Sequence, residues 1–309
     1  MFAFWTEGLK SLFVEFDQQL EVLDAIEPDI KRLFEEHRQR REQWYFHEYV
    51  PWEKGRNFVD EPWDISQCTI SEAARTSLVL NLLTEDNLPY YHSAIESRVP
   101  EDSALAEWNR LWTAEEGQHA IALRSYLLTS RNCNPRLLED DRLSVMTTGY
   151  HPSWQNIAEL FAYTTAQELA TRVSHRNAGK LTDDPVAFEL MRLIAGDENH
   201  HFIFYKGAMT ALVKEAPSLA LEGIYKALSS FEMPGTVIPG FLRRSIEIAK
   251  AGVYNLRIHH DRVLQPLLRD WNVGALENLT SKAAEIQEKL MQLPHQIIAR
   301  AERFEARFA

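Results

Sequence analysis

Residues 114–119 read Ala114-Glu115-Glu116-Gly117-Gln118-His119, and they interrupt the apolar face of a predicted helix. That face is marked by a row of residues at spacings of three and four: Leu105, Trp108, Trp112, Glu116, His119, Leu123 and Tyr126. Because such spacings put side chains on one side of a helix, Glu116 and His119 are expected in the core. A carboxylate in a core is strongly destabilising unless it is paired, protonated or bound to a metal. The stretch therefore predicts a helix that carries a polar, functional pair into the interior.

Three further predicted helices carry acidic or histidine residues in their apolar rows. These residues are Glu85 in the helix over about 69–94, Glu168, Thr171 and His175 in the helix over about 153–180, and Glu198 and His201 in the helix over about 185–214. The chain thus has a single glutamate followed by Glu-x-x-His, and then the same order again. Glu85 and Glu116 lie 31 residues apart, and Glu168 and Glu198 lie 30 residues apart. This spacing indicates a pair of helices that is used twice.

The repeated units predict a site for two divalent metal ions. Two residues three positions apart on a helix are separated by about 60° around its axis, so a glutamate and a histidine can reach the same point. Four carboxylates balance the charge of two such ions, which permits their burial. Oxygen ligands with one histidine per metal favour iron or manganese over zinc, and they match the ligand set of ferritin-like di-iron bundles. A single Glu-x-x-His motif more often lies on a solvated helix face. The prediction of a metal site therefore depends on the repetition of the motif.

Residues beside the motifs carry weaker signals. Asp197 precedes the second Glu-x-x-His motif, and its carboxylate is expected to accept the N–H of a ligating histidine, although its position alone fits a surface acid equally well. Glu115 and His200 point away from the apolar rows and are expected to be exposed. Pro89 is expected to kink its helix because it has no N–H to donate to the carbonyl of Glu85.

Composition excludes several classes of function. The net charge of −12 over 309 residues argues against a nucleic-acid binder. The two cysteines, Cys68 and Cys133, cannot form a disulfide scaffold and favour a reducing compartment. The N-terminus has no basic segment followed by an apolar one, and no run approaches the about 20 apolar residues that a membrane span needs. We therefore expect a cytoplasmic protein that binds neither nucleic acid nor membrane.

Helical periodicity continues along the chain, and no long stretch alternates with the period of a strand, so we expect an all-α fold. We predict a single domain over residues 1–309, with a four-helix bundle core over about 69–215, N-terminal helices and a wrapping loop over 1–68, and C-terminal helices over 216–309. A helix break is expected near Pro28, and Asp184-Pro185 is a start signal for a helix. The remaining expected helices cover about 101–129, 135–143, 217–230, 239–252, 258–271, 277–292 and 294–308.

The chain resembles the soluble acyl-acyl carrier protein desaturases, the stearoyl type of plastids and actinobacteria. The resembling segments are Thr84-Glu-Asp-Asn-Leu-Pro-Tyr-Tyr91, Trp112-Thr-Ala-Glu-Glu-Gly-Gln-His119, Gln167-Glu-Leu-Ala-Thr171, Asp197-Glu-Asn-His-His201, and, outside the metal motifs, residues 44–51, 252–254, 271–273 and 292–294. The resemblance therefore covers most of the chain. It departs from the family at Gly117-Gln118, where Asn-Arg is common, and at Asn199-His200, where Lys-Arg is common.

The resemblance implies roles for nine residues. By position, Glu116 and Glu198 would bridge two irons. Glu85 with His119 would complete one iron, and Glu168 with His201 the other. Thr171 would be a proton relay, and Asp197 and Trp44 would support the site and the electron path. The implied reaction forms a cis double bond in a saturated fatty acyl chain on acyl carrier protein, with O2 as oxidant and electrons from ferredoxin. A homodimer is implied as well.

An acidic carrier protein requires a basic surface on a chain of such negative net charge. The candidates for this surface are Arg38, Arg40, Arg41, Arg243, Arg244 and Arg257.

Other di-iron proteins share the ligand pattern. A ribonucleotide reductase radical subunit usually has Asp as its first ligand and Tyr four residues after the first histidine, where this chain has Glu85 and Leu123, so we set it aside. A ferritin-like oxygenase that hydroxylates or N-oxidises a small molecule shares all the ligands and stays an alternative. An iron-storage protein is the non-enzymatic alternative, and the additional C-terminal helices disfavour it.

Overall fold

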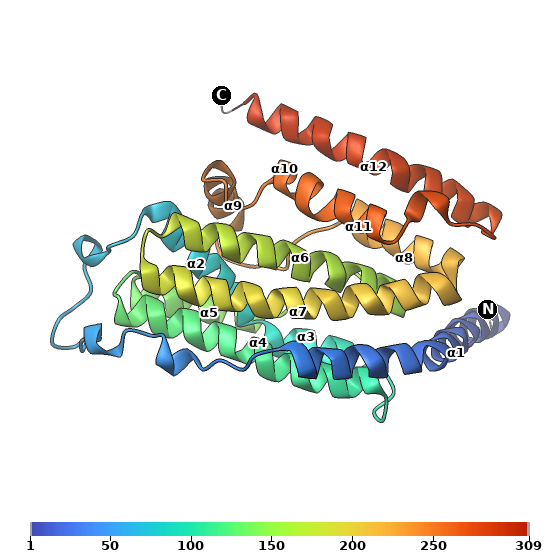
Figure 1. The fold of residues 1–309 in the computed structure, drawn as a ribbon, viewed down its shortest axis with the longest axis horizontal. Coiled ribbons are helices and arrows are strands. Elements are labelled where there is room, and N and C mark those ends of the chain that lie inside the picture. The colour runs from blue at the N-terminus through green and yellow to red at the C-terminus, as the bar shows by residue number, and fades with distance from the viewer. Residues whose placement is uncertain (1, 308–309) are drawn as a thin grey trace.

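The protein is all-helical, as the periodicity predicts. The computed structural model describes residues 2–307, with their side chains from residue 19 onward, and within this range no strand forms. The α-helices in Figure 1 are α1 (Phe2–Arg40), α2 (Glu72–Glu85), α3 (Leu88–Glu96), α4 (Ala104–Thr129), α5 (Pro135–Thr148), α6 (Ile157–Leu181), α7 (Pro185–Glu215), α8 (Pro217–Ser229), α9 (Phe241–Lys250), α10 (Leu256–His259), α11 (Gln265–Asp270) and α12 (Ser281–Glu305). A π-helical segment, η4 (His260–Leu264), joins α10 to α11. None of the helices within residues 2–307 combines the length and the apolar character that crossing a bilayer requires.

Four helices, α2, α4, α6 and α7, form the central bundle (Figure 1). α6 packs along α7 and α2 packs on α4, while contacts of α2 with α6 and of α4 with α7 close the ring. α1 lies against α7 and α4, and α8 packs on α6. The C-terminal helices form an outer layer in which η4 contacts α6 and α12 contacts α8. The organisation of the chain as a single domain stays a prediction.

Polar side chains define where the bundle helices begin. Ser71, Ser103 and Asn156 each accept a hydrogen bond from a first-turn N–H of α2, α4 and α6, respectively. Asp184 does the same for α7, and Pro185 is the first residue of that helix. The predicted Asp184-Pro185 start signal is therefore confirmed.

Two predicted helix breaks at prolines are wrong. α1 continues through Pro28, which is flanked by Ile26 and Ile30 with only 2% and 1% of their surfaces exposed. The burial of these two side chains holds the helix together across the hydrogen bond that the proline cannot make. The segments predicted as two helices, 277–292 and 294–308, form the continuous helix α12, which contains Pro294.

The prediction that Pro89 kinks a continuous helix is wrong, because the helix ends before Pro89 and a new helix begins there. α2 ends at Glu85, and α3 begins at Leu88 with Pro89 in its first turn. A proline is tolerated there because first-turn N–H groups have no partner within the helix. The break frees backbone carbonyls at the end of α2, and the hydroxyl of Tyr91 donates a hydrogen bond of 3.0 Å to one of them, the carbonyl of Thr84.

A polar layer divides the hydrophobic core of the bundle into two clusters. On α4, Trp108 and Trp112 belong to one cluster, while Leu123 and Tyr126 belong to the other. On α7, the residues before and after the Glu-x-x-His motif divide in the same way. The Glu-x-x-His motifs lie between the two clusters, so apolar side chains close both ends of the polar layer.

Candidate metal centre

All six predicted ligands meet in this polar layer. Their carboxylate and imidazole atoms form two groups, and within each group the atoms lie within 4.8 Å of one another. The two groups are Glu85, Glu116, His119 and Glu198, and Glu116, Glu168, Glu198 and His201. Glu116 and Glu198 belong to both groups, which is the relation that two bridging ligands require. The six side chains are buried, and their coordination of metal stays a prediction.

The helix repeat aligns the glutamate and histidine of each motif. On α4, His119 Nδ1 lies 3.0 Å from Glu116 Oε2, one helical turn away. The same atom of His201, on α7, lies 2.8 Å from Glu116 Oε1. Both histidines therefore turn Nδ1 toward the shared carboxylate, from two different helices.

The carboxylates of the cluster ionise very differently without a metal. Burial, together with the nearby Glu116 and Glu198, raises the pKa of Glu85 to about 7, although a hydrogen bond from His175 opposes the shift. Burial and the charge of Glu198 raise the pKa of Glu168 well above its ordinary value. Burial opposes ionisation of Glu116 too, but His119 and His201 outweigh it and hold its pKa well below the ordinary value. These opposed shifts are those of acids crowded around too little positive charge.

The donor set fits a pair of cations. Glu168 Oε2 and His201 Nδ1 are buried and make no well-directed hydrogen bond to a described residue, although His201 Nδ1 lies 2.8 Å from Glu116 Oε1 and 3.6 Å from Glu168 Oε2. Buried polar atoms without a hydrogen bond are rare in folded proteins. Both atoms can offer an electron pair toward the space that Glu116 and Glu198 share, so a divalent cation there would satisfy them.

Each histidine is held on its outer side by an acid from the opposite motif. His119 Nε2, on α4, lies 3.2 Å from Asp197 Oδ2, on α7. His201 Nε2, on α7, lies 2.9 Å from Glu115 Oε2, on α4. A carboxylate at this nitrogen fixes the tautomer and directs the other nitrogen to the metal. Asp197 therefore lies beside a candidate ligand histidine, where its predicted role requires it, and that role stays a prediction; Glu115 holds the corresponding position beside His201.

Glu115 was expected to be exposed, and that prediction is wrong. Its side chain is only 6% exposed, and besides His201 it contacts His37 Nε2 at 3.0 Å. Burial opposes its ionisation, but the hydrogen bonds from His201 and His37 lower its pKa to about 2. His200, also expected to be exposed, is half-buried. The sequence signal for Glu115 was available, because an acid precedes Glu116 as Asp197 precedes Glu198.

Residues at the end of α1 and just after it complete the support of the two outer acids. Arg41 donates to both oxygens of Asp197, at 3.0 and 2.9 Å, and its Nε lies 3.3 Å from Glu115 Oε2. The indole N–H of Trp44 donates to Asp197 Oδ2 at 2.9 Å. Arg41 therefore lies inside the protein, with 6% of its side chain exposed, and the interpretation of Arg41 as part of a carrier-binding surface is wrong.

Two further α6 side chains touch the cluster. The hydroxyl of Thr171 donates to Glu198 Oε2 at 2.9 Å, which places this predicted relay against a shared carboxylate. His175 Nε2 lies 3.4 Å from Glu85 Oε1 and 3.3 Å from Glu198 Oε1. Burial opposes protonation of His175, but these glutamates raise its pKa to about 9. Sequence reasoning placed His175 in the apolar row of α6 but assigned it no role.

Comparison with known proteins assigns this cluster to a family. The family model described as "Fatty acid desaturase" matches residues 18–309. The chain belongs to the fatty acid desaturase family. The protein named acyl-acyl carrier protein desaturase DesA1, from Mycobacterium tuberculosis, is 38% identical to this desaturase over 93% of this chain and 88% of its own length. The chloroplastic stearoyl-acyl carrier protein 9-desaturase 1 of Arabidopsis thaliana is 28% identical over 85% of this chain and 72% of its own length.

A solved structure supports the architecture. The X-ray structure of a protein named acyl-ACP desaturase DesA2, from Mycobacterium tuberculosis, matches with a TM-score of 0.70 over 82% of this chain and 96% of that chain, at 23% identity. At this identity the likeness concerns the fold. It confirms the expected ferritin-like bundle.

Proposed function

We propose that this chain introduces a cis double bond into a saturated fatty acyl chain carried on acyl carrier protein, with O2 as oxidant and ferredoxin as electron donor. The observation that carries the proposal is the pair of ligand groups that share Glu116 and Glu198, in a member of the fatty acid desaturase family. The names of DesA1 and of the Arabidopsis relative support acyl carrier protein as the carrier.

Two iron ions per chain are the cofactor of this proposal. Glu85 and His119 would hold one ion, Glu168 and His201 the other, and the two shared glutamates of the cluster would hold both. Bound there, iron would supply the oxidising power toward an unactivated alkyl chain that amino-acid side chains lack. In the balanced reaction, two hydrogens leave the chain, and O2 with two electrons and two protons becomes two waters.

The chain's own residues exclude water and hold protons at the centre. Trp108 and Phe204, with exposures of 0% and 1%, stack at 3.6 Å between ring centroids on one side of the polar layer. Exclusion of water prevents side reactions at a strongly oxidising centre. Thr171 holds its hydroxyl proton against Glu198, where it can pass a proton to or from the metal-binding side. Asp197 and Glu115 keep the histidines oriented.

A row of tyrosines leads from the cluster to the surface. Tyr91, whose pKa is raised by burial and by Tyr150, Glu85 and Glu116, lies beside the ligands. Its ring contacts that of Tyr150 edge-on, with centroids 4.9 Å apart, and the hydroxyl of Tyr150 donates to that of Tyr163 at 3.3 Å.

Tyr150 and Tyr163 line a surface cavity of about 520 Å³ between the α5–α6 loop and the segment after α8. We propose that the acyl chain enters at this cavity, which we call the acyl mouth, because the row Tyr91, Tyr150 and Tyr163 connects the cavity to the candidate ligands. Lys226 lies on its rim, exposed and without a counter-ion among the described residues. An acidic carrier protein docked over this mouth would meet that positive charge.

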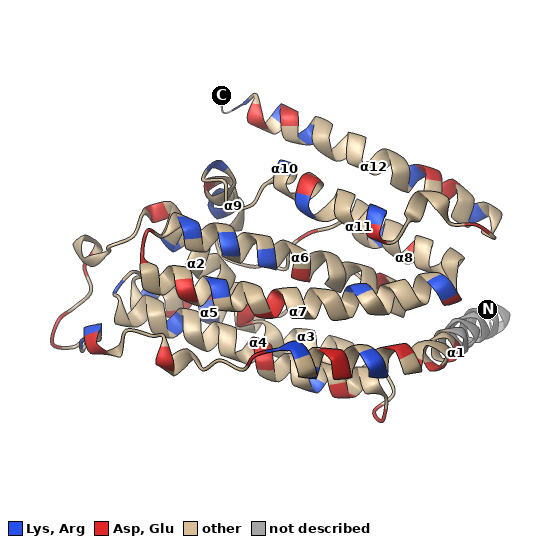
Figure 2. Cartoon of the chain, in the orientation of Figure 1, with Lys and Arg blue, Asp and Glu red and all other residues tan. Residues whose placement is uncertain are grey.

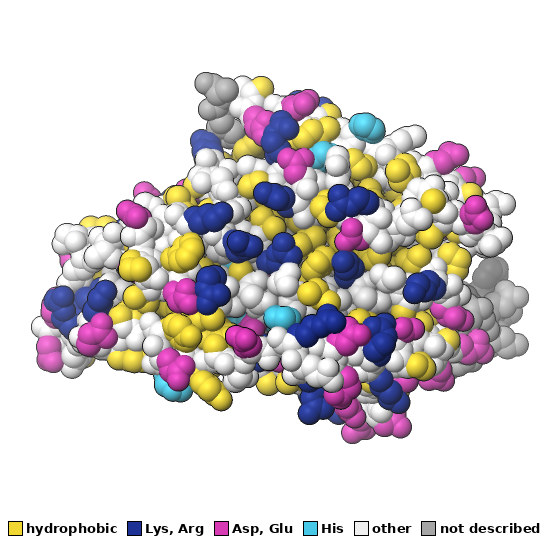
Figure 3. Space-filling model, viewed as in Figure 1, with side chains coloured by type: hydrophobic (Ala, Val, Ile, Leu, Met, Phe, Trp, Pro, Cys, Tyr) yellow, Lys and Arg dark blue, Asp and Glu magenta, His cyan; other side chains and the backbone are white. Residues whose placement is uncertain are grey.

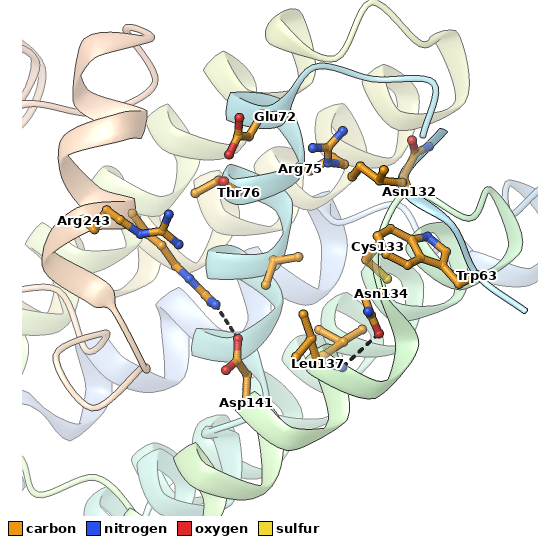
Figure 4. A pocket seen from close by; sticks show the side chains of 14 residues that line it. Trp63, Glu72, Arg75, Thr76, Asn132, Cys133, Asn134, Leu137, Asp141 and Arg243 are labelled. Atoms are coloured by element: carbon orange, nitrogen blue, oxygen red, sulfur yellow. Dashed lines mark hydrogen bonds and ion pairs between the residues drawn. The ribbon is translucent and has the colours of Figure 1, made fainter. Parts of the chain in front are cut away.

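The arginines predicted to contact the carrier are mostly neutralised within the chain. Arg244 pairs with Asp141 at 2.6 Å in a separate cavity of about 220 Å³ between α2, α5 and α9, and Arg243 extends into the same cavity (Figure 4). Arg257 pairs with Glu305 at 2.8 Å. A carrier contact through Arg243 and Arg244 stays a prediction.

The location and assembly of the protein are proposals as well. We infer a cytoplasmic protein from the two cysteines, both unpaired, of which Cys133 is buried. We infer a homodimer from the family resemblance.

The test of this function is incubation of the iron-loaded protein with saturated acyl carrier proteins of several chain lengths, ferredoxin, its reductase and O2. Mass spectrometry then locates any double bond, and iron analysis is expected to give about two ions per chain. Glu116→Ala should abolish product and lower iron content, while Glu107→Ala, an exposed acid on the same helix, should change neither. A hydroxylated or N-oxidised product would instead support the oxygenase alternative, and many irons per chain would support storage.

A further inference from the structure

Three arginines on the outside of the α6–η4 contact have no acidic partner within the part of the chain whose side chains are described. Arg172 and Arg176 lie one turn apart on α6, and Arg262 lies on η4, which packs against α6. Among the described residues, none of these guanidinium groups forms an ion pair. Figure 2 shows basic residues in a row along α6, and Figure 3 shows basic side chains gathered over the middle of this face. We call Arg172, Arg176 and Arg262 the arginine triad.

The three guanidinium groups of the triad repel one another, which destabilises the isolated chain. Burial and the neighbouring guanidinium groups of Arg176 and Arg262 lower the pKa of Arg172 below its usual value. A chain of net charge −12 has many acids that could neutralise such a group, as Asp141 neutralises Arg244. Repulsion that is left uncompensated in the monomer is relieved when an anionic surface docks, which makes the triad a feature of binding.

The triad adjoins the metal centre through short bonded paths. Arg172 Nη1 donates a hydrogen bond of 2.6 Å to Asn199 Oδ1, and Asn199 is the chain neighbour of Glu198. Arg172 also follows Thr171, which binds Glu198 directly. On the other flank of α7, Trp44 and Asp197 connect to His119 through hydrogen bonds of 2.9 and 3.2 Å. A redox group placed over the triad therefore has a bonded route to Glu198, through Arg172 and its neighbours Thr171 and Asn199.

We propose that the arginine triad, with the adjacent outer side of α7, is the docking surface for the acidic protein that delivers electrons to the metal centre. The inference rests on the proposed function, in which each double bond requires two electrons from outside the chain. Electron-transfer encounters use small, charge-steered interfaces that form and separate quickly. A compact cluster of unpaired cations beside the centre suits such an encounter.

Two other partners fit this surface less well. A second copy of the chain, docked about a twofold axis through the triad, would set arginines against arginines. The carrier protein has to sit over the acyl mouth at Tyr163, and Arg176 lies 13 residues further along α6, about 20 Å at the rise of an α-helix. The triad is therefore assigned to the electron donor, and the carrier is assigned to the mouth.

The experiment compares two double charge reversals in the iron-loaded protein. Arg176→Glu/Arg262→Glu disrupts the triad at two exposed side chains, and Lys214→Glu/Lys289→Glu makes the same change in net charge at exposed lysines on α7 and α12. Steady-state desaturation is measured against the concentration of a reduced 2Fe–2S ferredoxin, at low and high salt, and separately against the concentration of acyl carrier protein. A single turnover is also measured after reduction by dithionite with a small mediator.

The triad variant is expected to raise the KM for ferredoxin about tenfold or more and to lose most of its salt dependence. Its KM for acyl carrier protein and its single turnover after chemical reduction should match the wild type, as should every value for the lysine variant. An unchanged KM for ferredoxin, or an equal rise in the lysine variant, overturns the docking surface. A rise in the KM for acyl carrier protein alone overturns it in favour of the carrier. If the wild type forms no double bond after chemical reduction, the proposed function itself fails.

Discussion

Substitution of Arg41 tests whether the ion pairs around the candidate metal centre stabilise the protein. Its guanidinium bridges Asp197 and Glu115, the acids that hold the two ligand histidines. In the variant Arg41→Met, a side chain of similar length fills the space, but two acids with exposures of 4% and 6% lose their shared cation. Arg40→Met is the matched control, because Arg40 is 58% exposed and pairs at 3.3 Å with Glu36, four residues earlier in the same helix.

The magnitude follows from the difference in burial. Removal of one partner from a buried charge pair costs about 3–5 kcal/mol, whereas an exposed pair four residues apart contributes about 0.3–0.5 kcal/mol. For 309 residues, an unfolding entropy of about 2.1 cal/mol/K per residue converts these values into Tm changes of about 5–8 °C for Arg41→Met and less than about 1 °C for Arg40→Met. The loss should be smaller in the double variant Arg41→Met/Asp197→Asn, in which the acid loses its charge together with its partner.

The assay is thermal unfolding followed by circular dichroism, on metal-free and iron-loaded protein. Iron analysis of the Arg41 variant adds a second readout, because disturbed supports weaken metal binding about 10–100-fold. Equal melting temperatures for Arg41→Met and Arg40→Met would show that the two carboxylates do not depend on this cation. The assignment of Arg41 to the interior would then be wrong.

Three further changes test other contacts. Thr171→Val keeps the shape but removes the hydroxyl that binds a shared carboxylate, so we expect about tenfold slower turnover and more O2 consumed per double bond, with Thr171→Ser close to wild type. Trp112→Phe removes the N–H bound to Glu168 at 3.2 Å and should weaken metal binding to the apoprotein about tenfold in titrations. Trp108→Phe is the control, because the indole N–H of Trp108 forms no hydrogen bond with a candidate ligand. Burial lowers the pKa of His259 to about 4, below about 6.5 for the unfolded chain, so stability in urea should fall as the pH drops from about 6.5 to 4, and His259→Gln should flatten that slope. Unchanged O2 coupling, equal metal affinities of the two tryptophan variants, or an unchanged slope would contradict these three expectations in turn.

The sequence was sufficient to predict those features that depend only on the position of a residue along a single helix. The four bundle helices and the convergence of the six candidate ligands follow from period and spacing, because a helix fixes which residues share a face. Arg41 and Glu115 were misplaced because their burial depends on how α1 lies across α4 and α7, which no local pattern encodes. Pro28 was misjudged for a related reason, since tertiary packing can outweigh a lost backbone hydrogen bond.

The arginine triad was missed because its members come from segments about 90 residues apart in the chain, and each one alone reads as an ordinary solvated charge. The basic surface predicted in its place was built from two groups of arginines, at 38–41 and 243–257. Most of those arginines have intramolecular acid partners, such as Glu35 for Arg38 and Glu305 for Arg257. Counting basic residues along a sequence therefore finds paired charges as readily as free ones, and only the structure separates the two.

The crossed acids also explain why the two halves of the metal centre cannot vary independently. Asp197 lies on α7 but orients His119 on α4, and Glu115 lies on α4 but orients His201 on α7. A change in either helix therefore disturbs the histidine of the other, and a shift of α4 against α7 misaligns both. Because Arg41 binds both acids, the end of α1 fixes the separation of these two helices at the level of the ligands. The repeated helix pair supplies the candidate ligands. The contacts of Asp197 and Glu115 with histidines of the opposite helix, together with Arg41 between the two acids, join these ligands into one site.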